Sequence, residues 1–190
     1  MILTLIFIDS LKDINNILKK KNIIFVISNP NIDDEYTFKN NILTIKCNNT
    51  FDYLQFKTFF TFQTILQIKE LNMYTHIVKI NYNKNLNVYI SPTITSDKLK
   101  DINYCGKKLN TVIERDWHFD KCPIYSSWYE KKYDGKCVPY IDGNSGYILS
   151  RHSLILICRE KFKEIKNHIY DDLMISIILS KHNITPTILH

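Results

Sequence analysis

Four short apolar runs near the start of this 190-residue chain are the feature that most constrains its fold. They consist mainly of Ile, Leu, Phe and Val, and polar turn residues such as Asp9-Ser10 and Asn29-Pro30 stop them. Apolar runs without polar alternation are typical of strands that are covered on both faces, as in parallel sheets. The runs are Ile2–Ile8, Asn22–Ser28, Asn41–Lys46 and Thr75–Ile80, and a fifth candidate spans residues 87–92.

Helical patterns separate these predicted strands. Residues 11–20 follow Ser10, which suits a helix N-cap, and residues 50–71 carry apolar side chains at near-helical spacing, with Thr50 as their predicted N-cap. Strands that alternate with helices predict an α/β fold, here a three-layer domain with a Rossmann-like, mostly parallel central sheet. Such sheets bind ligands at the carboxyl ends of their strands, and Asn81–Asn83 lies at one of these ends.

The second half of the chain has a weaker pattern. Aromatic residues are scattered through the polar stretch 97–142, after which residues 146–150 suit a strand. Helices are expected to begin at Arg151 and to span residues 171–182, and residues 183–190 suit a last strand or a tail. The length and the low Gly and Pro content predict one domain over residues 1–190, with a ligand-binding half at 1–92 and a second half at 93–190.

Composition excludes some classes of function. The net charge of +6 comes from scattered lysines rather than a basic stripe, which argues against a nucleic-acid-binding protein and is compatible with a phosphorylated ligand. No apolar run is long enough for a transmembrane segment. The five cysteines contain no Cys-x-x-Cys pair, which argues against a zinc site. Cys122 and Cys137 can pair across a loop, but we expect reduced thiols and a cytoplasmic protein.

Several ordered segments carry a likeness to a known family. They are "IFVIS" (24–28), "NTFDYLQFKT" (49–58), "KINYN" (79–83), "SWY" (127–129), "CVPYIDGNSGYILS" (137–150) and "DDL" (171–173). In this order they resemble the motifs of the β-1,3-galactosyltransferase and Fringe-like glycosyltransferases, which have the GT-A fold. The likeness covers most of the chain, from about Ile24 to His190.

The resemblance implies transfer of a sugar from a nucleotide diphosphate donor, a UDP-sugar, with inversion at the anomeric carbon. The acceptor would be a hydroxyl group of a glycan or a protein, in a viral or microbial setting. Asp172 matches the position of the family's catalytic base, which takes the proton of the acceptor hydroxyl. The residues alone leave a second role open, because Asp171 and Asp172 also suit the first turn of a helix.

The resemblance also implies two sets of binding residues. The donor would lie against Ser28, Asn49, Lys57, Lys79, Asn81, Asn83 and Lys84. The acceptor or the transferred sugar would lie against Trp128, Gly143, Gly146 and Tyr147. Considered alone, the two glycines suit an ordinary turn better than a sugar site, and Trp128 suits partial burial in a loop at least as well as contact with a sugar.

The family's metal-binding acids are missing. At the two positions where the family holds a divalent cation with acids, this chain has Asn81 and Asn83, whose amide oxygens bind hard cations more weakly than carboxylates do. His190 lies near the family's histidine ligand and His182 is another candidate, although a terminal histidine can simply be frayed.

Three interpretations follow from the missing acids. The first is transfer without a metal, in which Lys79 or Lys84 provides the positive charge. The second is a catalytically silent relative that binds a nucleotide or a glycan. The third is weak binding of Mn²⁺ or Mg²⁺ by the amides.

Overall fold

The computed structural model describes residues 1–16, 22–82, 97–110 and 122–189. Within these residues a large sheet runs through the molecule in the strand order β10-β6-β9-β5-β1-β2-β4-β3. A separate pair, β7 and β8, lies beside it. The strands are β1 (Ile2–Phe7), β2 (Ile23–Ser28), β3 (Tyr36–Lys39), β4 (Ile42–Ile45), β5 (His76–Asn81), β6 (Tyr104–Gly106), β7 (Leu109–Asn110), β8 (Tyr140–Ile141), β9 (Tyr147–Ser150) and β10 (Thr187–Ile188).

The centre of the sheet is parallel, as the apolar runs predict. Strand β1 pairs in parallel with β2 and β5, and β2 pairs in parallel with β4. The register places Phe7 opposite Asn81, so the carboxyl ends of β1 and β5 meet at one edge. Strand β9 is antiparallel to both β5 and β6. The α/β class and the mostly parallel sheet are therefore confirmed.

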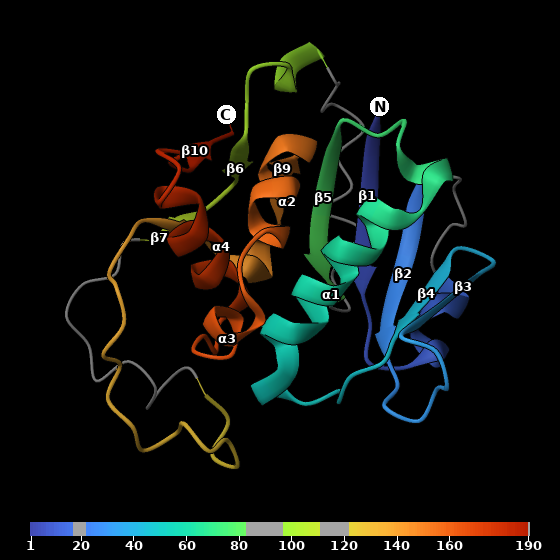
Figure 1. The fold of residues 1–190 in the computed structure, drawn as a ribbon, viewed down its shortest axis with the longest axis horizontal. Coiled ribbons are helices and arrows are strands. Elements are labelled where there is room, and N and C mark those ends of the chain that lie inside the picture. The colour runs from blue at the N-terminus through green and yellow to red at the C-terminus, as the bar shows by residue number, and fades with distance from the viewer. Residues whose placement is uncertain (17–21, 83–96, 111–121, 190) are drawn as a thin grey trace.

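The α-helices lie on one face of the sheet, as Figure 1 shows. They are α1 (Leu54–Gln67), α2 (Arg151–Cys158), α3 (Phe162–Ile165) and α4 (Asp171–Ser180). Side chains of β1, β2 and β5 that point to this face, such as Leu5, Val26 and Ile77, form the main core with α1 and α4. On the opposite face a smaller apolar cluster includes Ile6, Phe25 and Ile14, the last from a 3-10 helix at Leu11–Asn16.

Several local predictions need correction. The helix expected over residues 11–20 is a 3-10 helix at Leu11–Asn16 as far as it is described. The helix from Arg151 stops at Cys158, and α3 is a separate turn. Thr50 precedes a 3-10 helix (Phe51–Tyr53), but its side chain makes no capping hydrogen bond.

Strands β3, β6, β7 and β8 were not expected, because they are too short to leave a periodic pattern. The strand predicted at 87–92 lies outside the described residues.

Two other sequence predictions bear on the whole chain. The five cysteines all lie in the described part of the chain and form no disulfide, so the Cys122–Cys137 pairing is not formed, and Cys137 is exposed. Among the described residues, none of the helices has both the length and the apolar character needed to cross a membrane.

Candidate functional site

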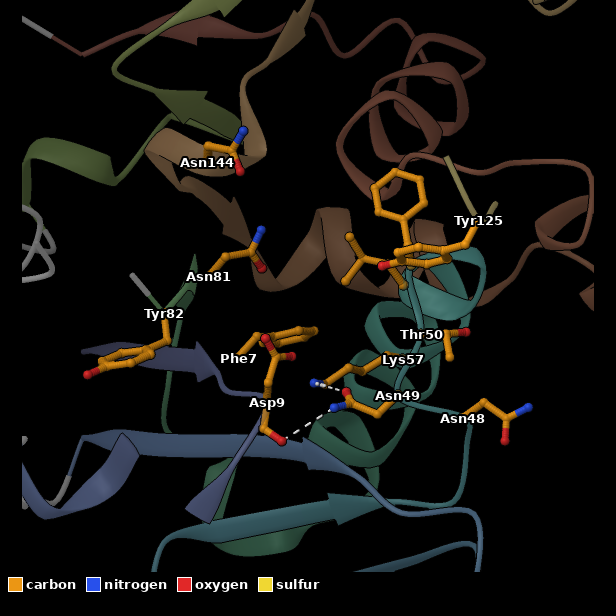
Figure 2. A pocket seen from close by; sticks show the side chains of 12 residues that line it. Phe7, Asp9, Asn48, Asn49, Thr50, Lys57, Asn81, Tyr82, Tyr125 and Asn144 are labelled. Atoms are coloured by element: carbon orange, nitrogen blue, oxygen red, sulfur yellow. Dashed lines mark hydrogen bonds between the residues drawn. The ribbon is translucent and has the colours of Figure 1, made fainter. Parts of the chain in front are cut away.

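A cleft opens at the carboxyl ends of β1 and β5, beside the start of α1. Its cavity has a volume of about 580 Å³. Figure 2 shows side chains from these elements and Asn144 around the cavity. The lining residues are Phe7, Asp9, Asn48, Asn49, Thr50, Phe51, Leu54, Lys57, Asn81, Tyr82, Tyr125 and Asn144. The position is the one expected for a ligand of a parallel sheet.

A second cavity of about 140 Å³ adjoins the first. The two share Phe51, Leu54, Asn81 and Asn144 as lining residues, so they form one continuous cleft. The second cavity is lined by the loop before β9 and by the start of α4, and it contains Asp172. The structure thus brings Asn49, Lys57, Asn81, Gly143 and Asp172 to one cleft, although they come from distant parts of the sequence.

Lys57 is the one lysine or arginine among the described residues that line the cleft. It lies on α1 and is buried, and its Nζ donates hydrogen bonds to the Ile8 carbonyl at 3.0 Å and to Asn49 Oδ1 at 3.1 Å. Asn49 in turn donates to the Asp9 carbonyl at 3.4 Å, and Figure 2 marks this chain of contacts. Burial lowers the pKa of Lys57 from 10.5 to about 8, although the charge of Asp9 opposes the shift.

Asp172 lies in the first turn of α4 and remains partly accessible. Its Oδ2 accepts a hydrogen bond of 2.9 Å from the Gly143 N–H, and its Oδ1 accepts one of 2.8 Å from the Leu173 N–H. Burial and the charge of Asp171 raise the pKa of Asp172 from 3.8 to about 7, against the effect of the two N–H groups and Lys79. The carboxyl group therefore contributes to the helix start and also lines the cleft, so its place in the helix is compatible with the catalytic role expected from the sequence.

Lys79 lies beneath the cleft rather than in its wall. Its side chain is fully buried, and its Nζ is 2.8 Å from Asp171 Oδ2. The same oxygen accepts hydrogen bonds from Thr58 Oγ1 at 3.1 Å and from the Tyr147 hydroxyl at 3.0 Å. Lys79 and Tyr147 were both expected to contact a ligand, but their side chains contact this buried carboxylate instead.

The two glycines of the loop before β9 have different roles. Gly143 brings its N–H to Asp172, and a Cβ at this position would lie 3.2 Å from Asp172 Oδ2. Gly146 has a φ of 76°, and a Cβ there would lie 3.1 Å from the Lys79 carbonyl. Gly143 thus shapes the cleft, whereas Gly146 allows the backbone to turn tightly into β9.

Other predicted residues lie elsewhere. Ser28 is buried at the end of β2, where it accepts a hydrogen bond from the Cys47 thiol. Trp128 is half-buried in a loop and its ring packs under Lys131, with 4.5 Å between Nζ and the ring centre. Asn83, Lys84 and His190 lie outside the described residues, and His182 is exposed after α4.

Sequence reasoning missed several polar or aromatic residues of the cleft wall, among them Asp9, Tyr82, Tyr125 and Asn144. A signal for Asp9 was present, because it directly follows the first buried strand just as Asn81 ends the fourth. Figure 2 shows the carboxylate of Asp9 and the amide of Asn81 directed into the same cavity. Tyr125 had no comparable signal, since it comes from an irregular stretch of the chain.

A divalent cation would need several ligands in this cleft. Asp9 and Asn81 line it, but the described part of the chain has no group of three or more His, Cys, Asp and Glu side chains placed to hold a metal. The described side chains therefore do not fit a metal centre held by the protein, and the chemistry below includes no metal step.

Comparison with known proteins finds no family model and no curated protein that matches this chain. The likeness to the β-1,3-galactosyltransferase and Fringe-like family therefore stays a prediction from the sequence.

Proposed function

We propose that this protein is an inverting glycosyltransferase that transfers a sugar from a nucleotide diphosphate donor to a hydroxyl group. The observation that carries the proposal is the continuous cleft, with the cation of Lys57 in one part and the carboxyl group of Asp172 in the other. A diphosphate needs a positive charge, and a hydroxyl nucleophile needs a base. The order of the glycosyltransferase-like motifs in the sequence supports the same function.

In the proposed reaction, the acceptor hydroxyl lies in the smaller cavity against Asp172. As its oxygen attacks the anomeric carbon, Asp172 takes the proton, and the bond from that carbon to the diphosphate oxygen breaks. The diphosphate leaves with the bonding electrons, and the ammonium group of Lys57 offsets its growing negative charge. A carboxyl group with a pKa of about 7 is suited to accept a proton near neutral pH.

In this proposal Lys57 provides the positive charge that was expected from Lys79 or Lys84. Lys79 is paired with Asp171, so its charge is already balanced within the core. Within the described part of the chain, the hydrogen-bond acceptors of Lys57 are both neutral, the Ile8 carbonyl and the Asn49 amide. Asp9 would repel a phosphate group, but its oxygens suit the hydroxyl groups of a ribose or a hexose.

The first test is turnover of radiolabelled UDP-hexoses by the purified protein, measured as transfer to glycan acceptors and as slow hydrolysis. Asp172→Asn should lower turnover by about 10²–10⁴-fold, the usual contribution of a general base, and leave UDP affinity within about twofold. The matched control is Asp134→Asn, which changes an exposed carboxylate on a loop. Full activity of Asp172→Asn would exclude Asp172 as the base.

The second test addresses the metal. UDP affinity is measured by calorimetry with EDTA and with added Mn²⁺ or Mg²⁺. Because Lys57 provides the positive charge in this proposal, the affinities should agree within about threefold, a difference of less than 1 kcal/mol. A large loss of affinity in EDTA would instead favour a cation bound at Asp9 and Asn81.

A catalytically silent nucleotide-binding or glycan-binding protein is the second candidate. The observation that favours it is Asn81 at the strand end, where the resembling family has an acid. UDP binding that depends on Lys57, without transfer or hydrolysis of any UDP-hexose, would distinguish this binding protein from a glycosyltransferase.

A further inference from the structure

A buried charge cluster lies at the floor of the cleft, where Asp171 is one of the residues that line the smaller cavity, and four elements contribute to the cluster. Lys79 comes from β5, Asp171 from α4, Thr58 from α1 and Tyr147 from β9. The side chains of Lys79 and Asp171 are 0% and 4% exposed, and their charged atoms are 2.8 Å apart. Among the described residues the ammonium group has this ion pair but no hydrogen-bond partner of good geometry, and it packs against the rings of Phe7 and Tyr147 at 4.9 and 5.4 Å.

The alternation of β5 places Lys79 in this position. Ile77 and Lys79 point to the helix face of the sheet, whereas Ile80 belongs to the cluster on the other face. A buried ion pair contributes little to the free energy of folding, because the desolvation of two charges offsets most of their attraction. Apolar residues of similar size often stabilise a core at least as much in its place. Stability alone therefore gives little reason for a lysine and an aspartate here.

The position of the pair relative to Asp172 suggests another reason. Asp171 and Asp172 are adjacent in the first turn of α4, so the negative charge of Asp171 disfavours a second charge on Asp172. Two N–H groups, of Gly143 and Leu173, favour the charged form of Asp172, and the cation of Lys79 acts in the same direction from β5. The remaining titratable groups that interact with Asp172 are the hydroxyls of Tyr104 on β6, Tyr147 on β9 and Tyr170 before α4.

We propose that Lys79 and Asp171 form a built-in charge pair that positions Asp172 and makes it the carboxylate of the two that exchanges a proton with the cleft. Lys79, Thr58 and Tyr147 all contact the same oxygen of Asp171, which holds that carboxylate group in the core opposite the Lys79 ammonium group. The fixed charge lies behind Asp172, which alone of the two turns to Gly143. Lys79 and Asp171 are thus positioning residues, and this role rests on the proposed function, in which Asp172 is the base.

The test is a direct titration of Asp172, which requires neither substrate nor turnover. The protein is labelled with carbon-13 at the aspartate carboxyl groups, and the Asp172 resonance is assigned by its loss in Asp172→Asn. The main variant is Lys79→Met with Asp171→Asn, which removes both buried charges together. The charge of Asp171 affects Asp172 more strongly than that of Lys79, so the midpoint of the Asp172 titration should fall by about one pH unit or more.

Two further variants make the test robust. Lys79→Gln with Asp171→Asn keeps a polar pair in the core and should give the same downward shift if the first variant folds poorly. Asp134→Asn is the matched control, because Asp134 is an exposed loop carboxylate that does not line the cleft, so the midpoint should move by less than about 0.3 pH units.

An unchanged or raised midpoint in a folded double variant overturns the inference. If sugar transfer is found, the acid limb of its kcat/KM profile should shift with the titration midpoint, a change that a purely structural role would not cause. If the midpoint falls but no UDP-hexose is turned over, the charge pair stands and the proposed function fails. If transfer depends on Asp172 and the midpoint does not move, the proposed function stands and the charge-pair role fails.

Discussion

The Gly143 N–H donates a hydrogen bond of 2.9 Å to Asp172 Oδ2, and this contact joins the loop before β9 to the start of α4. It fixes the orientation of the carboxyl group at the wall of the cleft. The absence of a side chain at residue 143 makes the close approach possible, because a Cβ would lie only 3.2 Å from the same oxygen.

Gly143→Ala should therefore displace Asp172 by a few tenths of an ångström. Misplacement of a catalytic group by 1 Å can cost about 100-fold in rate, so we expect a loss of roughly tenfold in kcat. UDP affinity should hardly change, because Lys57 lies in the other part of the cleft. Steady-state kinetics and calorimetry measure the two effects separately. A variant with wild-type kcat would show that this contact does not position the base.

UDP affinity should decrease as the pH rises through the pKa of Lys57, which burial lowers to about 8. Below this pH the lysine is charged and pairs with the diphosphate, and above it the neutral amine cannot. Between pH 7 and pH 9.5 we expect roughly a tenfold loss, in the range of one charge-assisted hydrogen bond. Calorimetric titrations across this pH range measure the change.

Lys57→Met should bind UDP weakly at every pH, and its affinity should lose most of the alkaline decrease. Lys69→Met is the control, because Lys69 is exposed in a 3-10 helix that follows α1, at the other end from the cleft. If Lys57→Met retains both the affinity and the pH dependence of the wild type, Lys57 is not the cation that binds the diphosphate.

Lys79 and Asp171 should show a large coupling in a double-mutant cycle of stability. Lys79→Met leaves a buried carboxylate without its cation, which typically costs about 3–5 kcal/mol of unfolding free energy. Asp171→Asn leaves the cation alone and should cost a similar amount. The double variant should recover most of the loss, because neither charge remains buried. Urea denaturation gives the three values, and additive losses would contradict a coupled pair.

Gly146→Ala should destabilise the protein through its backbone. The φ of 76° and ψ of 156° at this residue belong to a region that side chains other than glycine rarely adopt, at a cost of about 1–3 kcal/mol. The added Cβ would also approach the Lys79 carbonyl at 3.1 Å. Urea denaturation should show this loss in Gly146→Ala and a smaller one in Gly143→Ala, where φ is not positive. Equal losses would contradict a backbone cause.

The central strands could be predicted because their sequences are apolar without interruption. Ile2–Phe7, Ile23–Ser28 and His76–Asn81 need cover on both faces, and a parallel sheet provides it. The break between α2 and α3 could not be predicted, because "CREKFKE" is compatible with a continuous helix. The short strand β6 could not be predicted either, because it pairs with β9 and β10, which lie far away in the chain.

The candidate site was predicted in part. Asn81 was singled out because it ends a buried strand, and Asp172 because it matches the base position of the resembling family; the structure places both at the cleft. Side chains two residues apart in a strand lie on the same face, so Lys79 shares the face of Ile77, which is a core residue. This alternation already indicated that Lys79 points into the core rather than toward a ligand. Its partner Asp171 could not be inferred, as nothing local connects the two residues.

The sequence by itself determined which segments are buried strands, and with them the edge of the sheet where a ligand can lie. The reason is that burial by the hydrophobic effect depends on which residues are apolar and how they are spaced, and both can be read directly from the sequence. Only the tertiary structure decided which charged side chain faces the cleft and which faces the core. Lys57 and Lys79 are the same residue type. A hydrogen bond to Asn49 holds Lys57 at the cavity, whereas Asp171 balances the charge of Lys79 beneath it. That difference arises from contacts between distant segments, which exist only after the chain has folded.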